Sequence, residues 1–193
     1  MLFRSYGFAI NLHRCIGCRT CTIACKMENA VADGIQRMRV LNDDETTVYD
    51  TPVGTYPSLQ FNWTPVPCMH CDAPPCVAAC PQGASAKRDD GIVTIDKEKC
   101  IGCKLCMEAC PYGARSYDEV TNTVDKCSLC SHRIDEGTET TMCQLCCPNR
   151  AITVGDLDNP DSAVAKIVAE KETFRLLPEE GTEPNVYYWD SMK

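Results

Sequence analysis

Cysteine is the residue type through which this chain could do chemistry. The sequence has 17 cysteines among 193 residues. Sixteen of them fall into four groups of four: Cys15, Cys18, Cys21, Cys25; Cys68, Cys71, Cys76, Cys80; Cys100, Cys103, Cys106, Cys110; and Cys127, Cys130, Cys143, Cys147. Such spacing is typical of 4Fe–4S clusters, each of which takes four thiolate ligands. The sequence therefore predicts four 4Fe–4S clusters, and four one-electron centres in one chain predict electron transfer.

Two other uses of cysteine fit the pattern less well. The cysteine count is odd, and the first 15 residues contain neither an apolar signal segment nor a twin arginine, which argues against a disulfide framework. Structural zinc sites usually take their ligands as two separated pairs. CIGCRTC and CIGCKLC are instead triplets with a fourth cysteine further on. A triplet on a tight turn suits three corners of one cubane cluster.

The fourth cysteine of each group is expected to bind a different cluster from its own triplet. In two-cluster ferredoxins the fourth cysteine ligates the cluster of the other group. Applied here, this crossing rule predicts four ligand sets: Cys15, Cys18, Cys21 and Cys147; Cys25, Cys127, Cys130 and Cys143; Cys68, Cys71, Cys76 and Cys110; Cys80, Cys100, Cys103 and Cys106. Cys147 is preferred to Cys146 because it keeps the three-residue spacing from Cys143 and precedes a proline. Cys146 is then expected to be a buried spare thiol.

Charged and titratable residues beside the cysteine groups are interpreted as supporting residues. Three histidines, His13, His70 and His132, are expected in supporting or surface roles, because the cysteines already complete the ligand count. A second set of residues either raises cluster potentials or is simply solvated, and the sequence favours neither interpretation: Lys26, Lys99, Lys104, Lys126 and Arg133. Trp63 and Tyr112 are expected to act in packing.

Composition excludes several function classes. The formal net charge is −8, which argues against nucleic acid as a partner. No apolar run reaches the roughly 18 residues of a membrane-spanning helix. No glycine-rich GxGxxG motif or catalytic constellation is present. We therefore expect no catalysis by the chain itself, and chemistry on a substrate is expected in another subunit.

The elements that must position the cysteines follow from an internal repeat. AINLHRCIGCRTC recurs as VTIDKEKCIGCKLC, and three groups end in CPQGASA, CPYGARS and CPNRAIT. Proline stops a helix or central strand after each of these groups, and a short strand should follow. Turn signals predict hairpins over 84–95 and 114–127, and short helices are expected after Cys21 and Cys106. A cysteine-free tail over 151–193 should hold a helix around 162–171.

Together these features predict a loop-rich α+β fold with two ferredoxin-like two-cluster units. Residues 66–125 form an inserted unit, which we call the inner unit. Residues 1–65 and 126–193 form the outer unit, with a linker over 26–67 and a docking tail. Because much of the apolar content is cysteine, we expect metal to hold the fold together more than a large apolar core does. Strand-like alternation in the linker falls on 36–41, 46–49 and 59–63.

The chain resembles the four-cluster iron–sulfur subunits of the DMSO reductase family of molybdenum or tungsten enzymes, especially polysulfide and thiosulfate reductase subunits. The resemblance covers CIGCRTCTIACKMEN, CMHCDAPPCVAACPQGA, CIGCKLCMEACPYGAR and CSLCSHR, and extends into the tail through GDLDNPDSAVAKIV and LLPEEGTEPNVYYW. Nitrate reductase relatives carry Trp at the position of Cys103 and a three-iron cluster there, so Cys103 implies four irons here.

The resemblance implies partners and a location. A molybdopterin-containing catalytic subunit would lie nearest the Cys15, Cys18, Cys21 and Cys147 set, and a membrane quinone-reactive subunit nearest the Cys80, Cys100, Cys103 and Cys106 set. The complex would be membrane-associated, on the outer face after co-export; a cytoplasmic location is the alternative. Two other functions fit the cysteine layout: a four-cluster subunit of a hydrogenase or formate-hydrogen-lyase assembly, and a free soluble polyferredoxin.

Overall fold

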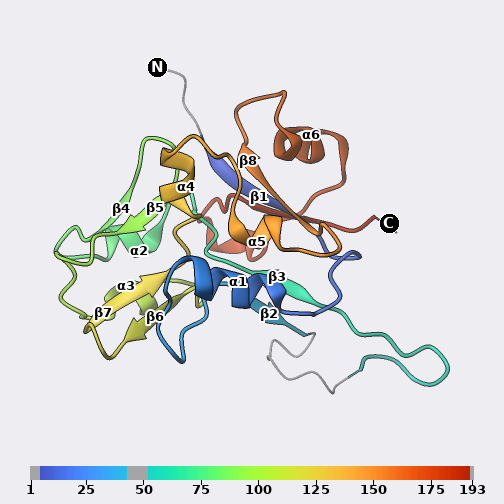
Figure 1. Cartoon of the computed structure of the whole chain (residues 1–193), viewed down its shortest axis with the longest axis horizontal. Helices are drawn as coiled ribbons and strands as arrows, with labels where there is room; N and C mark the ends of the chain where they lie inside the picture. The colour runs from blue at the N-terminus through green and yellow to red at the C-terminus, as the bar shows by residue number, and fades with distance from the viewer. Residues whose placement is uncertain (1–4, 43–51, 192–193) are drawn as a thin grey trace.

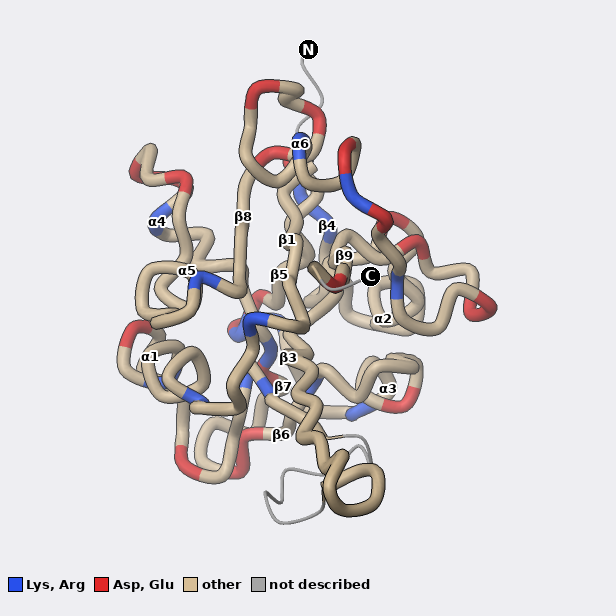
Figure 2. Tube along the Cα trace, turned by 90° about the vertical axis from the view of Figure 1, so that its right-hand side faces the viewer, with Lys and Arg blue, Asp and Glu red and all other residues tan. Residues whose placement is uncertain are grey.

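The structure is a computed structural model that describes residues 5–42 and 52–191 (Figure 1). Short strands and short helices alternate along the chain and leave long loops between them, as expected for the predicted loop-rich α+β fold. Most helices have only four or five residues, so little of the chain is held by helical hydrogen bonds alone. Basic and acidic residues are interspersed along the trace (Figure 2).

The largest sheet brings the two ends of the chain together. Strand β1 (Tyr6–Asn11) lies between β8 (Ile152–Asp156) and β9 (Val186–Trp189). The β1–β8 pair is antiparallel, with Phe8 opposite Val154, and the β1–β9 pair is parallel, with Phe8 opposite Val186. Helix α6 (Ala163–Glu170) packs against this sheet and starts at Ser162, whose Oγ accepts the Ala165 N–H at 3.1 Å. The predicted tail helix over 162–171 is therefore confirmed in position.

The apolar core lies mainly under this sheet. Tyr6, Phe8, Ile10 and Tyr188 are fully or almost fully buried there. A second cluster, between the helices and hairpins of 66–125, has just four buried members among the described residues: Cys76, Val93, Cys106 and Val124. Residues 66–125 also contribute Val66, Met69, Ile92 and Tyr112 to the larger core. The expectation of a fold without a large apolar core therefore underestimates this core, and the share of metal in holding the fold together stays a prediction.

Two hairpins follow the cysteine groups of the middle of the chain. Strands β4 (Ser85–Lys87) and β5 (Val93–Ile95) form one antiparallel pair, and β6 (Arg115–Asp118) and β7 (Thr123–Lys126) form the other. Both hairpins were predicted from the sequence. Helices α2 (Pro75–Ala78) and α3 (Leu105–Glu108) each precede one hairpin and pack on each other.

The remaining elements frame the outer cysteine groups. Helix α1 (Thr20–Glu28) packs on α5 (Met142–Leu145), and α4 (Ser131–Asp135) lies in the long segment between Cys130 and Cys143. A 3₁₀ helix, η1, covers Pro178–Glu180. Within the described residues, none of the helices combines the length and apolar character needed to cross a bilayer.

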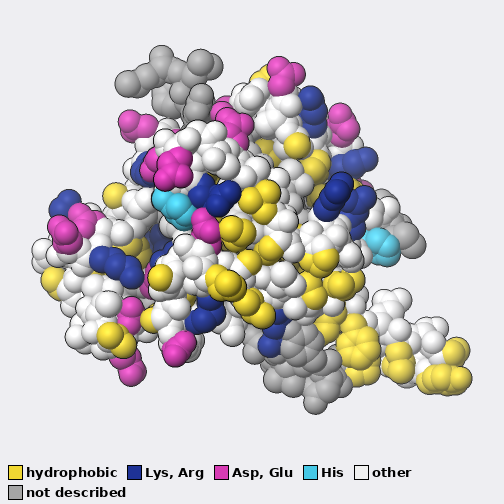
Figure 3. All heavy atoms as spheres, in the orientation of Figure 1, with side chains coloured by type: hydrophobic (Ala, Val, Ile, Leu, Met, Phe, Trp, Pro, Cys, Tyr) yellow, Lys and Arg dark blue, Asp and Glu magenta, His cyan; other side chains and the backbone are white. Residues whose placement is uncertain are grey.

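The linker strands begin later than the alternation predicted. Strand β2 covers Arg39–Leu41 and pairs with β3 (Thr64–Val66), so that Leu41 lies opposite Thr64. Residues 59–63 precede β3 and form no strand apart from an isolated bridge between Val53 and Gln60. The predicted strand over 46–49 lies outside the described residues. Residues 52–62 form a projecting arm, seen at the lower right of Figures 1 and 3.

Candidate metal centres

The first candidate centre is a hollow lined by Cys15, Cys18, Cys21 and Cys147. Gly17 turns the chain between the first two thiols with φ of +67°, and the face where its side chain would be is covered by the Trp63 ring. Arg19, with φ of +56°, then starts α1, which carries Cys21. The backbone N–H of Ala151 donates to Cys147 Sγ at 3.2 Å. The glycine is required because only a residue without Cβ fits both the turn and the overlying ring.

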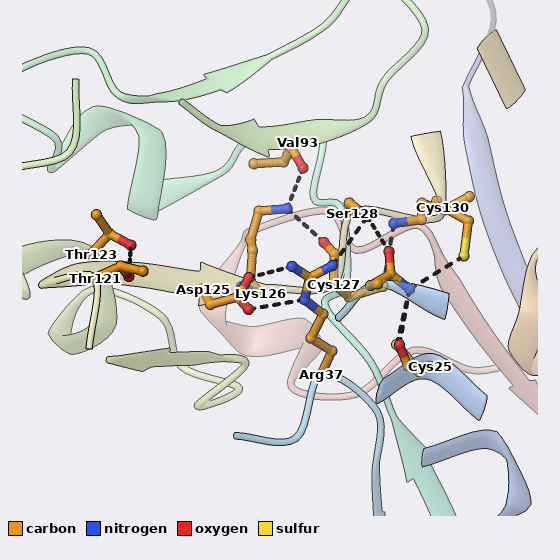
Figure 4. A network of polar contacts seen from close by, with 12 residues as sticks. Cys25, Arg37, Val93, Thr121, Thr123, Asp125, Lys126, Cys127, Ser128 and Cys130 are labelled. Carbon is orange, nitrogen blue, oxygen red and sulfur yellow. Dashed lines mark hydrogen bonds and ion pairs between the residues drawn. The ribbon is translucent and has the colours of Figure 1, made fainter. Parts of the chain in front are cut away.

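The second candidate centre is lined by Cys25, Cys127, Cys130 and Cys143, of which Figure 4 labels the first three. All four cysteines are buried. Asn29 Nδ2 lies 3.7 Å from Cys25 Sγ, and the Leu129 N–H donates to Cys127 Sγ at 3.4 Å. The Cys25 thiol thus lies with a triplet more than 100 residues away along the chain.

The polar network beside this second centre contains a buried ion pair. Arg37 forms an ion pair with Asp125 at 2.7 Å and lies close to Ser128 Oγ (Figure 4). Both charged side chains are largely buried. The Arg37 charge is therefore already compensated within the chain.

The third candidate centre brings together Cys68, Cys71, Cys76 and Cys110. Cys110 comes from the following cysteine group, yet it acts electrostatically on both Cys71 and Cys76. The Cys76 thiol accepts a hydrogen bond from Arg115 Nη2 at 2.9 Å. Helix α2 carries Cys76, and helix α3 ends two residues before Cys110. The two helices pack against each other.

The fourth candidate centre is a hollow lined by Cys80, Cys100, Cys103 and Cys106. Backbone N–H groups of Ser85 and Val124 donate to Cys80 Sγ and Cys100 Sγ, each at 3.4 Å. Gly102 turns the chain with φ of +66°, and Lys104, with φ of +64°, starts α3. This turn repeats the geometry of Gly17 and Arg19.

The chemistry of these four donor sets fits iron–sulfur clusters. Burial and, secondarily, neighbouring thiols raise the pKa of Cys21 and of Cys71 to about 12. Burial likewise raises the pKa of Cys127 to about 11. Four thiolates gathered together repel one another and need positive charge among them to ionise, and cluster iron supplies that charge. N–H donors to sulfur complete the arrangement, since such hydrogen bonds tune a bound cluster.

The four cysteine sets form a series, and the solvent exposure of their cysteines differs between its ends and its middle. Cys18 in the first set and Cys103 in the fourth set are the exposed cysteines. The second set is entirely buried, and the third has three buried cysteines and a half-buried Cys110. Burial and then the nearby Cys68 thiol of the third set raise the pKa of Cys127 in the second set, so these two sets are neighbours. The two solvent-accessible sets therefore lie at opposite ends of the series.

Cys146 takes a place between the first two sets. It does not line the hollow that Cys147 lines. Its thiol lies 3.7 Å from the carbonyl oxygen of Thr20 and 3.6 Å from that of Cys143. Cys146 is half-buried rather than buried, and it lies close enough to Cys21 to add to the effect of burial in raising the pKa of that thiol, as Cys147 also does. That Cys146 is a spare thiol therefore stays a prediction.

The charged residues singled out from the sequence have different environments. Lys26 Nζ donates to the carbonyl oxygens of Ala32 and Ile35, which braces the loop after α1. Lys99 pairs with Asp96 at the surface, Lys104 lies over the Tyr117 ring, and Arg133 pairs with Glu28. Lys126 is buried and donates to the carbonyl oxygens of Val93 and Cys127 (Figure 4).

The structure also shows the environments of two of the histidines and of the two aromatic residues singled out from the sequence. His132 contacts Glu28, while His70 is completely buried and its Nδ1 accepts the Val93 N–H at 3.0 Å. Burial, together with the charges of Lys126 and Arg115, lowers the pKa of His70 well below its usual value. Trp63 and Tyr112 pack in the core, as expected.

Sequence reasoning missed Arg115 altogether. This side chain contacts Cys76 and is 4 % exposed. Its position is equivalent to Ser85 in the preceding repeat, five residues after the last cysteine of the group. A signal was therefore present in the aligned repeats, although burial could not be read from it.

Comparison with known proteins agrees with this arrangement. The family model described as a 4Fe-4S dicluster domain matches residues 59–157, and a second model of the same description matches residues 14–85. These matches and the 17 cysteines support four 4Fe–4S clusters as the cofactors. The fold and the thiol-lined centres thus define an iron–sulfur protein of the 4Fe–4S dicluster class.

Sequence similarity to individual proteins identifies the family within this class. The chain is 43% identical to a putative dimethyl sulfoxide reductase iron-sulfur subunit of Halobacterium salinarum, over 95% of this chain and 78% of the relative. It is 38% identical to a polysulfide reductase component of Wolinella succinogenes, over 95% and 93%. A selenate reductase component of Mesobacillus selenatarsenatis is 38% identical, over 93% and 70%. The chain belongs to the family of iron–sulfur subunits of DMSO reductase-type molybdoenzyme reductases, and is an electron-transfer rather than a catalytic subunit.

Proposed function

We propose that this chain conducts electrons between a molybdopterin catalytic subunit and a membrane quinone-reactive subunit or another redox partner. One 4Fe–4S cluster would be bound in each of the four cysteine sets described above. Each bound cluster accepts and releases one electron. The observation that carries the proposal is the series of four thiol sets, with an exposed cysteine at each end and buried sets between them.

The order of the sets follows from shared elements. Cys21 and Cys25 lie four residues apart on α1 and belong to the first and second sets. Cys127 and Cys68 relate the second set to the third, and the packed helices α2 and α3 relate the third to the fourth. Electrons would therefore enter at one end of this series and leave at the other, in a direction that the partners' potentials decide.

The proposed division of the chain into units has the same basis. Residues 66–125 would form the inner unit, with the third and fourth sets. Residues 1–65 and 126–193 would form the outer unit, with the first and second. Pairing of β1 with β8 and β9 supports this division because it joins both ends of the chain into one sheet.

Exposed apolar residues near one end of the series support a partner there. The arm over 52–62 exposes Val53, Tyr56, Leu59 and Phe61 (Figure 3). Phe61 stacks on Trp63, which covers Gly17 at the first set. Contiguous apolar surface of this kind marks a protein interface. In the proposed complex the catalytic subunit lies at this end, and the complex is membrane-associated on the outer face.

The test is a metal analysis of the complex captured anaerobically through a tag on this chain. About 16 iron atoms per chain, expected from four clusters of four irons, together with molybdenum or tungsten and a stoichiometric partner would support the proposal. Nickel in place of molybdenum or tungsten would assign the chain to a hydrogenase assembly. The same iron with no partner and no other metal would make it a free polyferredoxin.

A further inference from the structure

Arg115 occupies a position whose counterparts are uncharged. Three cysteine groups end in Cys-Pro, and the fifth residue after that cysteine begins a strand: Ser85 begins β4, Arg115 begins β6 and Ile152 begins β8. The turn itself accepts a small or an apolar side chain at this position. The turn therefore does not explain why Arg115 carries a positive charge at this position.

The side chain of Arg115 lies between two of the proposed ligand sets. Nη2 donates to Cys76 Sγ of the third set at 2.9 Å, and Nη1 donates to Ser85 Oγ at 2.7 Å. Its charge also acts on Cys106 of the fourth set. The Ser85 N–H in turn donates to Cys80 Sγ of the fourth set. One guanidinium is thus connected to both sets, directly and through one serine.

No carboxylate compensates this charge within the part of the chain that the structure describes. Arginine stays protonated in proteins. Among the described residues, no Asp or Glu lies within ion-pair distance of Arg115, whereas Arg37 pairs with Asp125 at 2.7 Å and Arg88 with Asp90 at 2.8 Å. A buried charge without a counter-charge is strongly unfavourable. The remaining candidates for negative charge beside it are the thiolates of the two sets.

One donor of the guanidinium remains available. Arg115 Nε is buried and has no hydrogen-bond partner among the described residues. A buried donor without an acceptor costs free energy. The sulfur atoms of bound clusters would provide acceptors on this side, and hydrogen bonds to sulfur and local charge are the two influences that set cluster potentials.

We propose that Arg115 is a shared potential-setting residue for the third and fourth clusters. A fixed positive charge stabilises an electron added to either neighbour, so it raises both reduction potentials together. It also offsets the repulsion between the two sets when both hold an electron. This inference rests on the proposed ligand sets and on electron transfer as the function.

The experiment uses the whole complex, purified anaerobically, with Arg115→Gln, Arg115→Lys and Ser85→Ala. Iron per chain is measured first, and the potentials of all clusters are then measured by redox titration followed by electron paramagnetic resonance. Cys68→Ser and Cys103→Ser identify the third and fourth clusters, since each should alter one of the two. Arg88→Gln is the matched control, because Arg88 is an arginine whose charge is paired with Asp90 and Asp135.

With full iron retained, Arg115→Gln is expected to lower the potentials of the third and fourth clusters and leave the first and second unchanged. Arg115→Lys keeps the charge and should fall between Gln and the wild type. Ser85→Ala should shift the same two potentials by less, because the guanidinium stays but loses its anchor. Arg88→Gln should shift none.

Unchanged potentials in iron-replete Arg115→Gln would overturn the inference and leave Arg115 a structural residue. A shift in one cluster alone would overturn the shared role. If Arg115→Gln loses iron, the test passes to Arg115→Lys and Ser85→Ala. Unchanged potentials of the third and fourth clusters in both of these variants would then overturn the inference. Failure of the proposed function would look different, because the wild-type complex would then lack the iron of four clusters.

Discussion

The inner unit proposed over 66–125 carries Cys76 and Cys106 on the four-residue helices α2 and α3, whereas the outer unit proposed over the rest of the chain carries Cys21 and Cys25 on the nine-residue helix α1. The Cys-Pro element occurs in both, at Cys80 and Cys110 and at Cys147. The small buried cluster beside the inner hairpins has two cysteines among its four members. The core at the outer sheet of β1, β8 and β9 contains Tyr6, Phe8 and Tyr188.

The difference teaches how the same ligand chemistry can be stabilised in two ways. Metal ligation supplies folding free energy where apolar burial is scarce. Burial of aromatic residues supplies it in the outer unit, at roughly 1.5–3 kcal/mol for each large apolar side chain. The inner unit should therefore depend on its clusters for stability much more than the outer sheet does.

Removal of iron gives the largest expected difference between the units. After chelation under mild oxidation, amide hydrogen exchange in β4 to β7 should lose its protection almost completely. Amides of β1 and β8 should keep part of theirs, because Tyr6 and Ile10 are buried in this sheet and line neither the first nor the second thiol hollow. Mass spectrometry of peptides from both regions measures this. Equal loss of protection in the two regions would contradict the comparison.

Some cysteines are expected to ligate the cluster of another cysteine group, and replacing one of them should remove that other group's cluster. Cys110→Ser should damage the cluster of Cys68, Cys71 and Cys76, and leave the cluster of Cys100, Cys103 and Cys106. Cys25→Ser is the outer counterpart and should damage the cluster of Cys127, Cys130 and Cys143. Iron content and electron paramagnetic resonance report the loss. The crossing rule fails if each variant alters the cluster of its own triplet.

Alanine at the repeated turn glycines should destabilise the inner unit more than the outer. In both places a positive φ costs alanine about 1–3 kcal/mol. At Gly102 the new Cβ would lie 2.5 Å from the backbone oxygen of Asn122, which cannot move without the β6–β7 turn. At Gly17 it would meet the Trp63 ring at 2.5 Å, at the base of the projecting arm.

Iron retained after brief heating should therefore fall further for Gly102→Ala than for Gly17→Ala. The wild type and Gly34→Ala are the controls. Gly34 has a positive φ but nothing within 4 Å of an added Cβ, so it isolates the backbone cost. A greater loss for Gly17→Ala would mean that Trp63 is the more rigid obstacle.

Removal of the Cys146 thiol should have the smallest effect. Cys146→Ser leaves a hydroxyl that can donate to the same carbonyl oxygens of Thr20 and Cys143. All four clusters should assemble, and iron content should equal that of the wild type. Cys147→Ser is the paired variant and should cost the first cluster. Loss of iron from Cys146→Ser instead would transfer the ligand role to Cys146.

Local signals account for what the sequence predicted well. Proline after the last cysteine, and glycine or asparagine at the turns, located both inner hairpins. Ser162 before an apolar helical run located α6. The four thiol sets gathered by the crossing rule are also gathered in the structure; that they ligate iron in these sets remains a prediction.

Non-local features could not be read from the sequence. The four-residue helices α2 and α5 are too short to show helical periodicity. The parallel pairing of β9 with β1 joins residues about 180 positions apart, and no local pattern encodes it. The burial of Arg115 depends on α2 and β4, which come from the preceding repeat. These contacts exist only once the units are folded.

The central place of β1 has a consequence for synthesis of the chain. Strand β1 is synthesised before the other described strands, whereas its two partners, β8 and β9, are synthesised after β2 to β7. Domains of a growing chain fold as soon as their parts are available. In the proposed ligand assignment, residues 66–125 hold complete cysteine sets for two clusters well before β8 and β9 are translated, so cluster insertion should begin in the middle of the chain. In the same assignment the N-terminal cysteines would stay free thiols until Cys127, Cys143 and Cys147 have emerged.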